Sequence, residues 1–289
     1  MCCVTDRSTK INRSQPAIRF TQTVEWFSVS GMADTETAST RADGGVRSIA
    51  RAVEVLELFD VEHPTRTLRE LVASTGLPKT TVVRLLSTLD SLGLIADRGD
   101  STFGVGAGFL RWVTLAQSMW EVSTETRKIM TRLVDSCGET VNIYIRQDLN
   151  RVSIAQVEGT TTVRSVVEVG VPYALATGAA AKILLTGAPD QVVRSLVDAR
   201  PDLQLEPLQR EISGIREAGY SVTHGERELG ASAVAAPIVS SDGRVIAALS
   251  ASGPTSRFTA DRVGRYVDAV TAAAAEISAV GLGSVEVFL

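Results

Sequence analysis

The stretch from Thr67 to Leu92 constrains the fold more than any other part of the chain. Its start, Thr67 to Glu70, is a capping box, in which the threonine hydroxyl accepts from the third helical amide and the glutamate reaches back. Gly76 ends the short helix that follows, because a residue without Cβ adopts left-handed backbone angles without strain. Pro78 suits the start of the next helix. Two helices joined by a tight turn predict a helix-turn-helix.

The flanking segments extend this pattern on both sides. Apolar residues recur at three- and four-residue spacing over residues 48–59, which predicts a first amphipathic helix. Leucines and valines carry the third helix from Pro78 to Gly93. Two short extended runs, residues 94–98 and 102–105, follow across a Gly-Asp-Ser turn. A hairpin directly after the third helix predicts a wing.

The second half of the chain mixes helical and strand patterns. Residues 109–134 read as one connecting helix, with an apolar stripe wide enough for a partner. Val141, Ile143 and Ile145 alternate, as in a half-buried strand. Further strands are expected at residues 152–157, 163–169, 234–239 and 245–252, and further helices at 177–185, 190–198, 207–217 and 261–280. Because strands and helices interleave without a strict βαβ repeat, the fold class is α+β.

These patterns predict four parts. Residues 1–44, rich in Ser, Thr and charge, are expected to be a disordered arm, and both Met1 and Met32 are candidate starts. Residues 45–112 are the predicted winged helix-turn-helix domain, and residues 113–134 the linker helix. Residues 135–285 are the predicted effector-binding domain.

The composition excludes several classes of protein. The 289 residues carry 29 Lys+Arg against 33 Asp+Glu, a formal net charge of −4, so no general affinity for nucleic acid is expected. No apolar run approaches the roughly 20 residues of a membrane helix, and the N-terminus lacks the apolar centre of a secretory signal. The odd number of cysteines, three, gives no disulfide framework and favours the reducing cytoplasm.

Polar side chains gather at the start of the third predicted helix. Those expected to point outward are Lys79, Thr80, Thr81 and Arg84. In a helix-turn-helix these first turns enter the major groove, where hydroxyls meet base edges or phosphates and arginine offers a fork to guanine. Arg98 and Ser101 on the hairpin, and Arg47 before the first helix, are expected at the neighbouring backbone or minor groove.

The local charge balance leaves a purely structural interpretation open. Over residues 45–112, eight Lys and Arg side chains are cancelled by eight Asp and Glu side chains, so there is no net basic patch. Charged residues on short helices are usually just solvated. The pattern alone therefore leaves open a helix-turn-helix that contacts protein rather than DNA.

The order of the motifs resembles the IclR family of bacterial transcription regulators. The run GLPKTTVVRLLSTLDSLGLI, the hairpin and FGVGAGFL resemble that family's DNA-binding domain. GETVN at 138–142, GYSV at 219–222, Glu226, Gly230, AAP at 235–237 and AALSASGP at 247–254 then follow in the family's order. The resemblance covers about residues 46–280.

This resemblance implies a winged helix-turn-helix joined by a linker helix to a GAF-like α/β effector-binding domain. The expected partners are a double-stranded DNA operator, a small organic-acid effector, and further copies of the chain as a dimer or dimer of dimers. Repression is expected more than activation. No cofactor and no metal are expected, since two histidines leave little room for a histidine-based metal site.

The family's effector lies in a cup formed by the sheet. The matching positions here are Thr177, Ala179, Ala180, Ala233, Ser250 and Ser252. Thr177 is a good N-cap, and the free amides after it attract a carboxylate without a basic residue. Ser250 and Ser252 share one strand face. These groups equally suit a capped helix and satisfied backbone groups.

The chain departs from the family at this cup. Where the family commonly has Pro-Leu-His before the helix and Gly before the lysine, this chain has Ala174, Leu175, Ala176 and Ala181. Smaller side chains leave volume, and the lost histidine removes a polar group. We therefore expect a bulkier, largely apolar acid, aromatic acids included.

An enzyme acting on a small carboxylic acid, with the N-terminal helices as a structural cap, is the alternative function. It needs a nucleophile–base pair or a metal site, and the chain has only two histidines. His224 with Glu226 resembles half a zinc site, without a cysteine pair or second histidine beside it. Cys137 is expected to be a packed residue and Lys182 a helix-surface residue. The chain is therefore expected not to be an enzyme.

Overall fold

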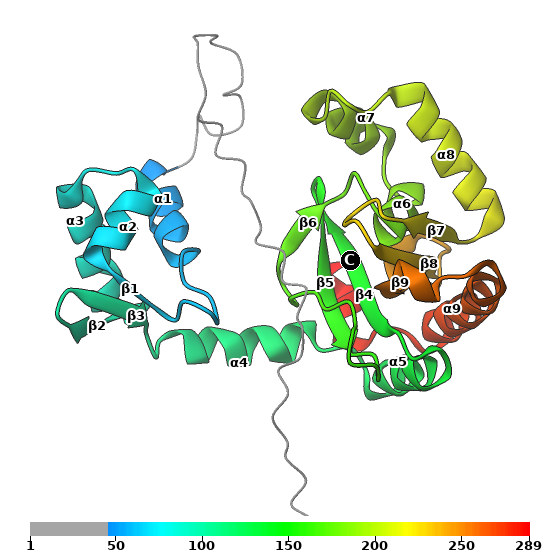
Figure 1. The fold of residues 1–289 in the computed structure, drawn as a ribbon, viewed down its shortest axis with the longest axis horizontal. Coiled ribbons are helices and arrows are strands. Elements are labelled where there is room, and N and C mark those ends of the chain that lie inside the picture. The colour runs from blue at the N-terminus through cyan, green and yellow to red at the C-terminus, as the bar shows by residue number, and fades with distance from the viewer. Residues whose placement is uncertain (1–45) are drawn as a thin grey trace, which may run out of the picture. The chain divides into compact units, whose positions relative to one another are not determined.

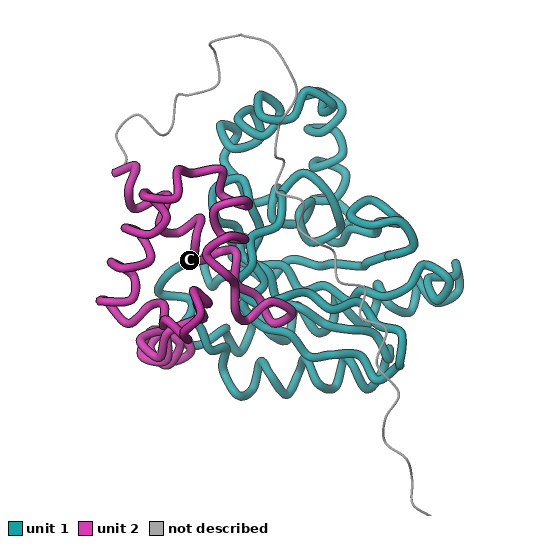
Figure 2. Tube along the Cα trace, turned by 60° about the vertical axis from the view of Figure 1, so that its left-hand side comes forward, with its two compact units in different colours: residues 1–23, 120–289 teal, residues 24–119 magenta. Residues whose placement is uncertain are grey.

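The computed structural model describes residues 46–289 and divides them into two compact units, residues 46–119 and 120–289 (Figure 2). Helices dominate the first unit and a large sheet with helices the second, so the fold class is α+β, as the sequence predicts (Figure 1). The arm predicted at residues 1–44, with both candidate starts, lies outside the described residues. No helix of residues 46–289 is both long and apolar enough to cross a lipid bilayer.

The first unit is a winged helix-turn-helix. Its elements are α1 (Arg47–Leu56), β1 (Thr65–Thr67), α2 (Leu68–Thr75), α3 (Lys79–Ser91), β2 (Ile95–Gly99) and β3 (Thr102–Val105). The three strands form an antiparallel sheet in the order β1-β3-β2. The sequence analysis missed β1, because three residues are too few to show an alternating pattern. The hydrophobic core of the first unit consists of Val55, Leu71, Val82, Leu86, Leu89 and Ile95.

Local sequence signals fix the turn between α2 and α3. The Glu70 amide donates to the Thr67 hydroxyl (3.3 Å) and the Thr67 amide donates to the Glu70 carboxylate (2.7 Å), which confirms the capping box. Gly76 has φ +64°, the left-handed conformation that ends α2, and Pro78 is the N-cap of α3. Neighbouring residues therefore fix where α2 ends and where α3 begins.

Two glycines after β3 let the chain pass closely over the end of α3. The amides of Gly106 and Gly108 donate to the carbonyls of Leu94 and Gly93, both at 2.9 Å. A Cβ atom at Gly106 would lie 2.2 Å from the Gly93 carbonyl oxygen, and one at Gly108 2.6 Å. These glycines serve close backbone packing at the exit from the wing.

The single helix predicted over residues 109–134 is wrong, because the chain forms two helices there. They are α4 (Phe109–Trp120) and α5 (Thr124–Cys137). Ser123 between them has extended angles (φ −56°, ψ 151°), and its hydroxyl accepts from the Thr126 amide at 3.1 Å. Ser123 is the N-cap of α5, so the chain leaves the helical conformation between Trp120 and Thr124. The apolar spacing continues through this break, and for that reason the sequence pattern predicted one helix.

The second unit is built on a six-stranded antiparallel sheet in the order β6-β5-β4-β9-β8-β7. The strands are β4 (Thr140–Gln147), β5 (Asn150–Val157), β6 (Pro172–Ala174), β7 (Ser221–His224), β8 (Ala231–Val239) and β9 (Val245–Pro254). The helices that follow α5 are α6 (Ala179–Thr186), α7 (Asp190–Ala199), α8 (Leu205–Ala218) and α9 (Ala260–Val280), with short 3-10 turns at Thr255–Arg257 and Gly283–Phe288.

Helices cover both faces of this sheet. Helices α5 and α9 pack on one face, and α6 with α7 and α8 lies on the other (Figure 1). Strand β4 is therefore buried on both faces, with Val141 and Ile143 in the first core and Tyr144 in the second. The expectation of a half-buried β4 is wrong. The alternation of apolar residues along the strand does not reveal that helices cover its second face as well.

The strand predicted at residues 163–169 is also wrong, because this segment is a loop. The Val167 amide donates to the Gln156 side-chain oxygen (3.0 Å) rather than to a neighbouring strand. The edge of β5 is instead paired by the three-residue β6, between Val152 and Pro172 among others. The alternating valines at residues 163–169 resemble a strand pattern, but β6 already pairs with the edge of β5.

Candidate DNA-binding surface and ligand pocket

The outward face of α3 carries the residues predicted to read DNA. Lys79, Thr80 and Arg84 are exposed, whereas Thr81 is half-buried. Val82, Leu86 and Leu89 on the opposite face pack into the core of the first unit. The apolar face thus fixes which side chains of α3 remain available to a partner.

Two further residues of this face were missed by the sequence analysis. Val83 is 45% exposed, and Ser87 is exposed one turn further along α3. Both share the face of Thr80 and Arg84 by helical spacing, which was the available signal. An exposed valine in this position has the apolar surface that contacts a thymine methyl group.

The wing and α1 add three exposed polar side chains. Arg98 lies on β2, where its guanidinium donates to the Val105 carbonyl (3.4 Å), and Ser101 lies in the turn with φ +56°. Arg47 is the exposed first residue of α1. Within residues 46–289, neither these two arginines nor Lys79 and Arg84 form an ion pair. Their charges are therefore free to meet phosphates.

A small cavity of about 30 Å³ lies between the N-terminus of α6 and the sheet. We call it the inner pocket; it is lined by Tyr144, Arg151, Ser165, Gly178, Ala179, Ala180, Thr223, Arg227, Ala231, Ser232, Ala233, Ser250 and Ser252. Of the six predicted ligand residues it brings together Ala179, Ala180, Ala233, Ser250 and Ser252, and it leaves out Thr177.

The prediction that Thr177 caps α6 is wrong. The N-cap is Gly178, with φ +92° and no capping side chain. A Cβ at this position would lie 3.4 Å from the Arg151 guanidinium, and the left-handed φ strains any side chain. Thr177 instead contributes its carbonyl oxygen, which accepts from Arg151.

Side chains of the protein already occupy part of the α6 N-terminus. The Gly178 amide donates to the Glu226 carboxylate and the Ala179 amide to the Thr223 hydroxyl, both at 3.1 Å. The amides of Ala180 and Ala181 find no acceptor among the described residues. The helix start therefore keeps two donors, fewer than the sequence suggested.

Arg151 is the strongest electrostatic feature of the inner pocket. It is 3% exposed, its guanidinium carbon lies 5.4 Å from the centre of the Tyr144 ring, and Nη1 donates to the Ala174 and Thr177 carbonyls. Within residues 46–289 its Nε has no hydrogen-bond partner, and no carboxylate pairs with the guanidinium. Burial lowers the pKa of Arg151, yet an arginine stays charged.

Asn142 adds a second unpaired donor on the same face of the sheet. It is 1% exposed, it lies opposite Ser250 in the β4–β9 pairing, and its Nδ2 has no acceptor among residues 46–289. Its Oδ1 accepts from the Ser153 hydroxyl at 3.2 Å. Two buried donors without acceptors among residues 46–289 carry a desolvation cost, and of the two only Arg151 lines the inner pocket.

The sequence analysis missed both Arg151 and Asn142. Asn142 stood within the GETVN motif, but only as a sign of resemblance, and Arg151 sat among the residues of an ordinary strand. No local pattern shows that either side chain is buried without a partner. Only the pairing of β4 with β5 and β9 brings them beneath α6.

Lys182 is not the surface residue predicted from the sequence. It is 9% exposed, and its ammonium pairs with Glu211 on α8 (2.5 Å) and with Glu226 (2.6 Å). Burial alone would lower the pKa of Lys182, but the hydrogen bonds that its ammonium donates to both carboxylates outweigh burial and raise that pKa. Because Glu226 also holds the Gly178 amide, this cluster fixes the start of α6 above the pocket.

The half zinc site considered at His224 and Glu226 is not assembled. His224 Nδ1 lies 2.9 Å from the Ser232 hydroxyl, and no group of three or more metal-binding side chains occurs in the described part of the chain. Cys137 is partly buried, and desolvation raises the pKa of its thiol.

Comparison with family models divides the chain as its two units suggest. Residues 48–99 match the IclR helix-turn-helix domain, and residues 114–279 match the bacterial transcriptional regulator IclR C-terminal domain. The transcriptional repressor IclR of Escherichia coli is 29% identical over 260 residues, which span 83% of this chain and 92% of that protein.

Solved structures show the same likeness. An IclR-family transcriptional regulator from Rhodococcus is 47% identical, with a TM-score of 0.57 over 87% of this chain and 100% of the other. An IclR homologue of Microbacterium hydrocarbonoxydans in complex with 4-hydroxybenzoate is 21% identical, with a TM-score of 0.66 over 83% and 99% of the two chains. The second likeness shows the fold alone.

Proposed function

The chain belongs to the IclR family of bacterial transcriptional regulators, and from this premise we propose that it is a DNA-binding repressor that responds to an organic acid. The first unit binds a double-stranded operator. The inner pocket of the second unit binds the acid. Binding of the acid changes the affinity for the operator.

The DNA-binding part of the proposal rests on the exposed face of α3. Lys79, Thr80, Val83 and Arg84 lie together at its start, where a recognition helix meets base edges. Arg84 has the length and the fork to contact guanine, and Lys79 contacts a phosphate. Arg98 and Ser101 on the wing and Arg47 on α1 contact the flanking backbone.

The buried, unpaired Arg151 is the observation that carries the ligand part of the proposal. A buried cation without a counter-ion is costly, and a carboxylate would supply both the charge and the missing acceptors. The free Ala180 amide, Ser250 and Ser252 lie around the same cavity and donate to the same group. An anionic ligand fits this set of donors better than a neutral one.

The apolar surroundings of these donors favour an acid with an apolar body, aromatic acids included. Ala179, Ala180, Ala231 and Ala233 offer methyl groups and no polar atoms in their side chains. The relative that binds 4-hydroxybenzoate makes benzoates suitable first probes.

We further propose that the protein acts as a dimer or a dimer of dimers. One recognition helix presents few base contacts, and the local charge is neutral, so a second half-site is needed for specific binding. Helix α4 exposes Leu110, Trp112, Val113 and Leu115, an apolar surface that suits contact with another copy. The acid then acts by its different affinity for the DNA-competent and DNA-incompetent arrangements.

A fluorescence-anisotropy titration tests the proposal. The full chain is titrated against labelled DNA from upstream of its own gene, with scrambled DNA as competitor, at several salt concentrations. Specific binding should weaken as salt rises, and addition of benzoate or related acids should release the DNA. Absence of specific binding at low salt, with and without acids, would contradict a DNA-binding function.

The enzyme alternative would rest on Ser232, because His224 Nδ1 lies 2.9 Å from the hydroxyl of this pocket residue. His224 does not line the inner pocket, and within residues 46–289 no carboxylate pairs with it to orient the ring as a base. The proposal of a regulator therefore stands ahead of the enzyme.

A further inference from the structure

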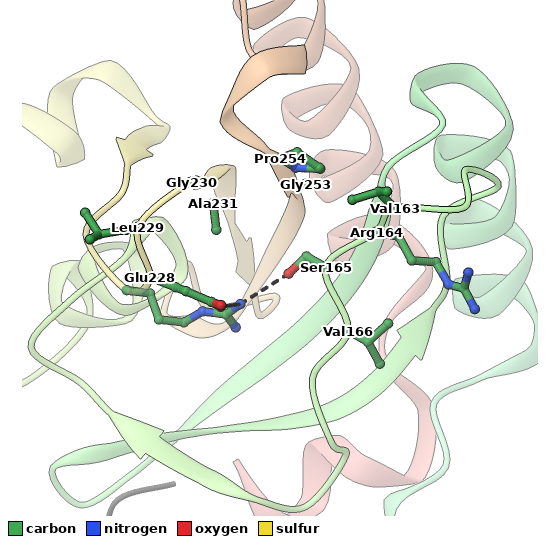
Figure 3. Close-up of a pocket in the computed structure, with 11 residues that line it drawn as sticks. Val163, Arg164, Ser165, Val166, Glu228, Leu229, Gly230, Ala231, Gly253 and Pro254 are labelled. Atoms are coloured by element: carbon green, nitrogen blue, oxygen red, sulfur yellow. Dashed lines mark hydrogen bonds and ion pairs between the residues drawn. The ribbon is translucent and has the colours of Figure 1, made fainter. Parts of the chain in front are cut away.

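A second, larger hollow adjoins the inner pocket in the second unit. It has a volume of about 120 Å³, and we call it the outer hollow (Figure 3). It lies between the loop that follows β5, the loop between β7 and β8, and the end of β9. Its lining residues are Val163, Arg164, Ser165, Val166, Arg227, Glu228, Leu229, Gly230, Ala231, Gly253 and Pro254. Nothing in the proposed function uses this hollow.

The two cavities meet at a shared wall. Ser165, Arg227 and Ala231 line both of them, and the Arg227 guanidinium donates to the Ser165 hydroxyl at 3.2 Å across the boundary (Figure 3). This hydrogen bond joins two partly buried side chains that belong to both cavities. A bound molecule that replaces it would reach from one cavity into the other.

The far wall of the outer hollow is well fixed. Arg257 forms a two-point ion pair with buried Glu139, both contacts at 2.6 Å, and donates to the Val163 carbonyl at 3.0 Å. The Thr255 amide donates to the Gly230 carbonyl at 2.7 Å, which ties the end of β9 to the opposite loop. The hollow is therefore held open by bonded walls.

The sizes of the cavities separate their roles. The inner pocket, at about 30 Å³, has room for about two water molecules, which is the size of a carboxylate group. The outer hollow, at about 120 Å³, approaches the roughly 150 Å³ of a cavity that binds benzene. Its lining includes the apolar side chains of Val163, Val166 and Pro254, whereas Arg164 points away and pairs with Glu158 (Figure 3).

We propose that the outer hollow is a tail subsite, and that the ligand is an amphipathic acid that spans both cavities. Its carboxylate lies against Arg151 and the start of α6, and its apolar tail passes Arg227 and Ser165 to lie against Val163, Val166 and Pro254. The inference rests on the proposed acid-binding function and adds the class of acid. Acids of two or three carbons fill only the inner pocket and bind weakly.

Titration calorimetry of the full chain with a homologous series tests this inference. The probes are benzoate and its 4-methyl, 4-propyl and 4-pentyl derivatives, which keep one head group and lengthen the tail. Affinity should rise about fourfold for each buried methylene until the hollow is full. The same series is measured on a Val163→Asn/Val166→Asn variant, whose new side chains are polar but uncharged and so leave the field at the carboxylate unchanged.

Val169→Asn is the matched control. Val169 belongs to the same loop and is 55% exposed, but it lines neither cavity. The double variant should lose the gain along the series, whereas the control should keep it, and thermal melts establish that both variants are folded.

Each outcome decides a different claim. A gain along the series that the double variant loses supports the tail subsite. Binding of benzoate with no gain along the series, or a gain that the double variant keeps, overturns the tail subsite and leaves the acid-binding function standing. No binding of any member to the unmodified chain overturns the acid-binding function and the tail subsite together.

Discussion

The recognition face of α3 and the inner pocket use polar side chains in opposite ways. On α3 the polar groups are exposed, neighbours in sequence, and free of ion pairs within residues 46–289. Arg151 in the pocket and Asn142 on the same face of the sheet are almost fully buried, and they come from different strands. The first region is a surface that follows from one helix, whereas the second exists only because distant segments pack together.

Function and stability are coupled in the pocket and largely separate on α3. Exposed side chains of α3 contribute little to folding, because water already satisfies them. Buried donors without acceptors reduce stability until a ligand supplies the acceptors. Substitutions on α3 should therefore change binding alone, whereas substitutions around the pocket should change binding and stability together.

The largest effect is expected from Arg151→Gln. Loss of the charged donor should lower the affinity for benzoate by roughly 100-fold, because hydrogen bonds to charged groups contribute about 1.5–3 kcal/mol each. Titration calorimetry measures it, with operator binding in the absence of acid as the control. Unchanged affinity for benzoate would mean that the Arg151 guanidinium does not contact the acid. The proposed coupling of ligand binding and burial in the pocket would then be wrong.

Arg84→Ala tests the other region. Operator affinity should fall by roughly 10- to 100-fold, because one contact between an arginine and a base edge is worth about 1–3 kcal/mol. The melting temperature and the affinity for acid should stay the same, since Arg84 is exposed and forms no ion pair within the described residues 46–289. Anisotropy and calorimetry on one preparation give both readouts. Equal loss of operator and acid binding would contradict a separation of the two functions.

Lys182→Met probes the charge cluster that holds α6. Removing the ammonium should lower the free energy of unfolding by about 2 kcal/mol, less than for a fully buried pair because Glu211 remains 45% exposed. Because pairing raises the pKa of Lys182, the stabilisation is fully present below its ordinary pKa and is lost as the pH rises through the raised value. The difference in free energy of unfolding between the unmodified chain and Lys182→Met, measured by denaturant melts, should thus stay constant from about pH 7 to about pH 10 and shrink above that. A difference that shrinks well below pH 10 would argue against the cluster.

Thr67→Ala has the smallest expected effect. It removes the cap of α2 and should cost about 1 kcal/mol in the first unit. Acid binding should not change, whereas operator affinity should fall slightly as the turn before α3 loosens. Hydrogen exchange of the α2 amides measures the local loss. Loss of hydrogen-exchange protection confined to the second unit would contradict a local stabilisation of α2 by Thr67.

The sequence alone determined the first unit closely. The capping box, Gly76 and Pro78 act on residues within a turn or two of themselves, so α2, α3 and the outward positions of Lys79, Thr80 and Arg84 could be predicted. The predicted ligand positions Ser250 and Ser252 also line one cavity, because alternation along a strand is a local property. The motifs in their order were enough to identify the family.

Which residues line the pocket depends on long-range packing that local sequence patterns do not show. Segments that the sequence analysis got wrong are held by residues far away in sequence. The Ser123 amide donates to the Leu282 carbonyl at 2.9 Å, Arg257 donates to the Val163 carbonyl, and the Gly178 amide donates to the Glu226 carboxylate. The burial of Arg151 and Asn142 needs the whole sheet and α6 above it, and the outer hollow needs three separate segments to meet. Burial is a property of packing, and local periodicity does not report whether a buried group has found its partner.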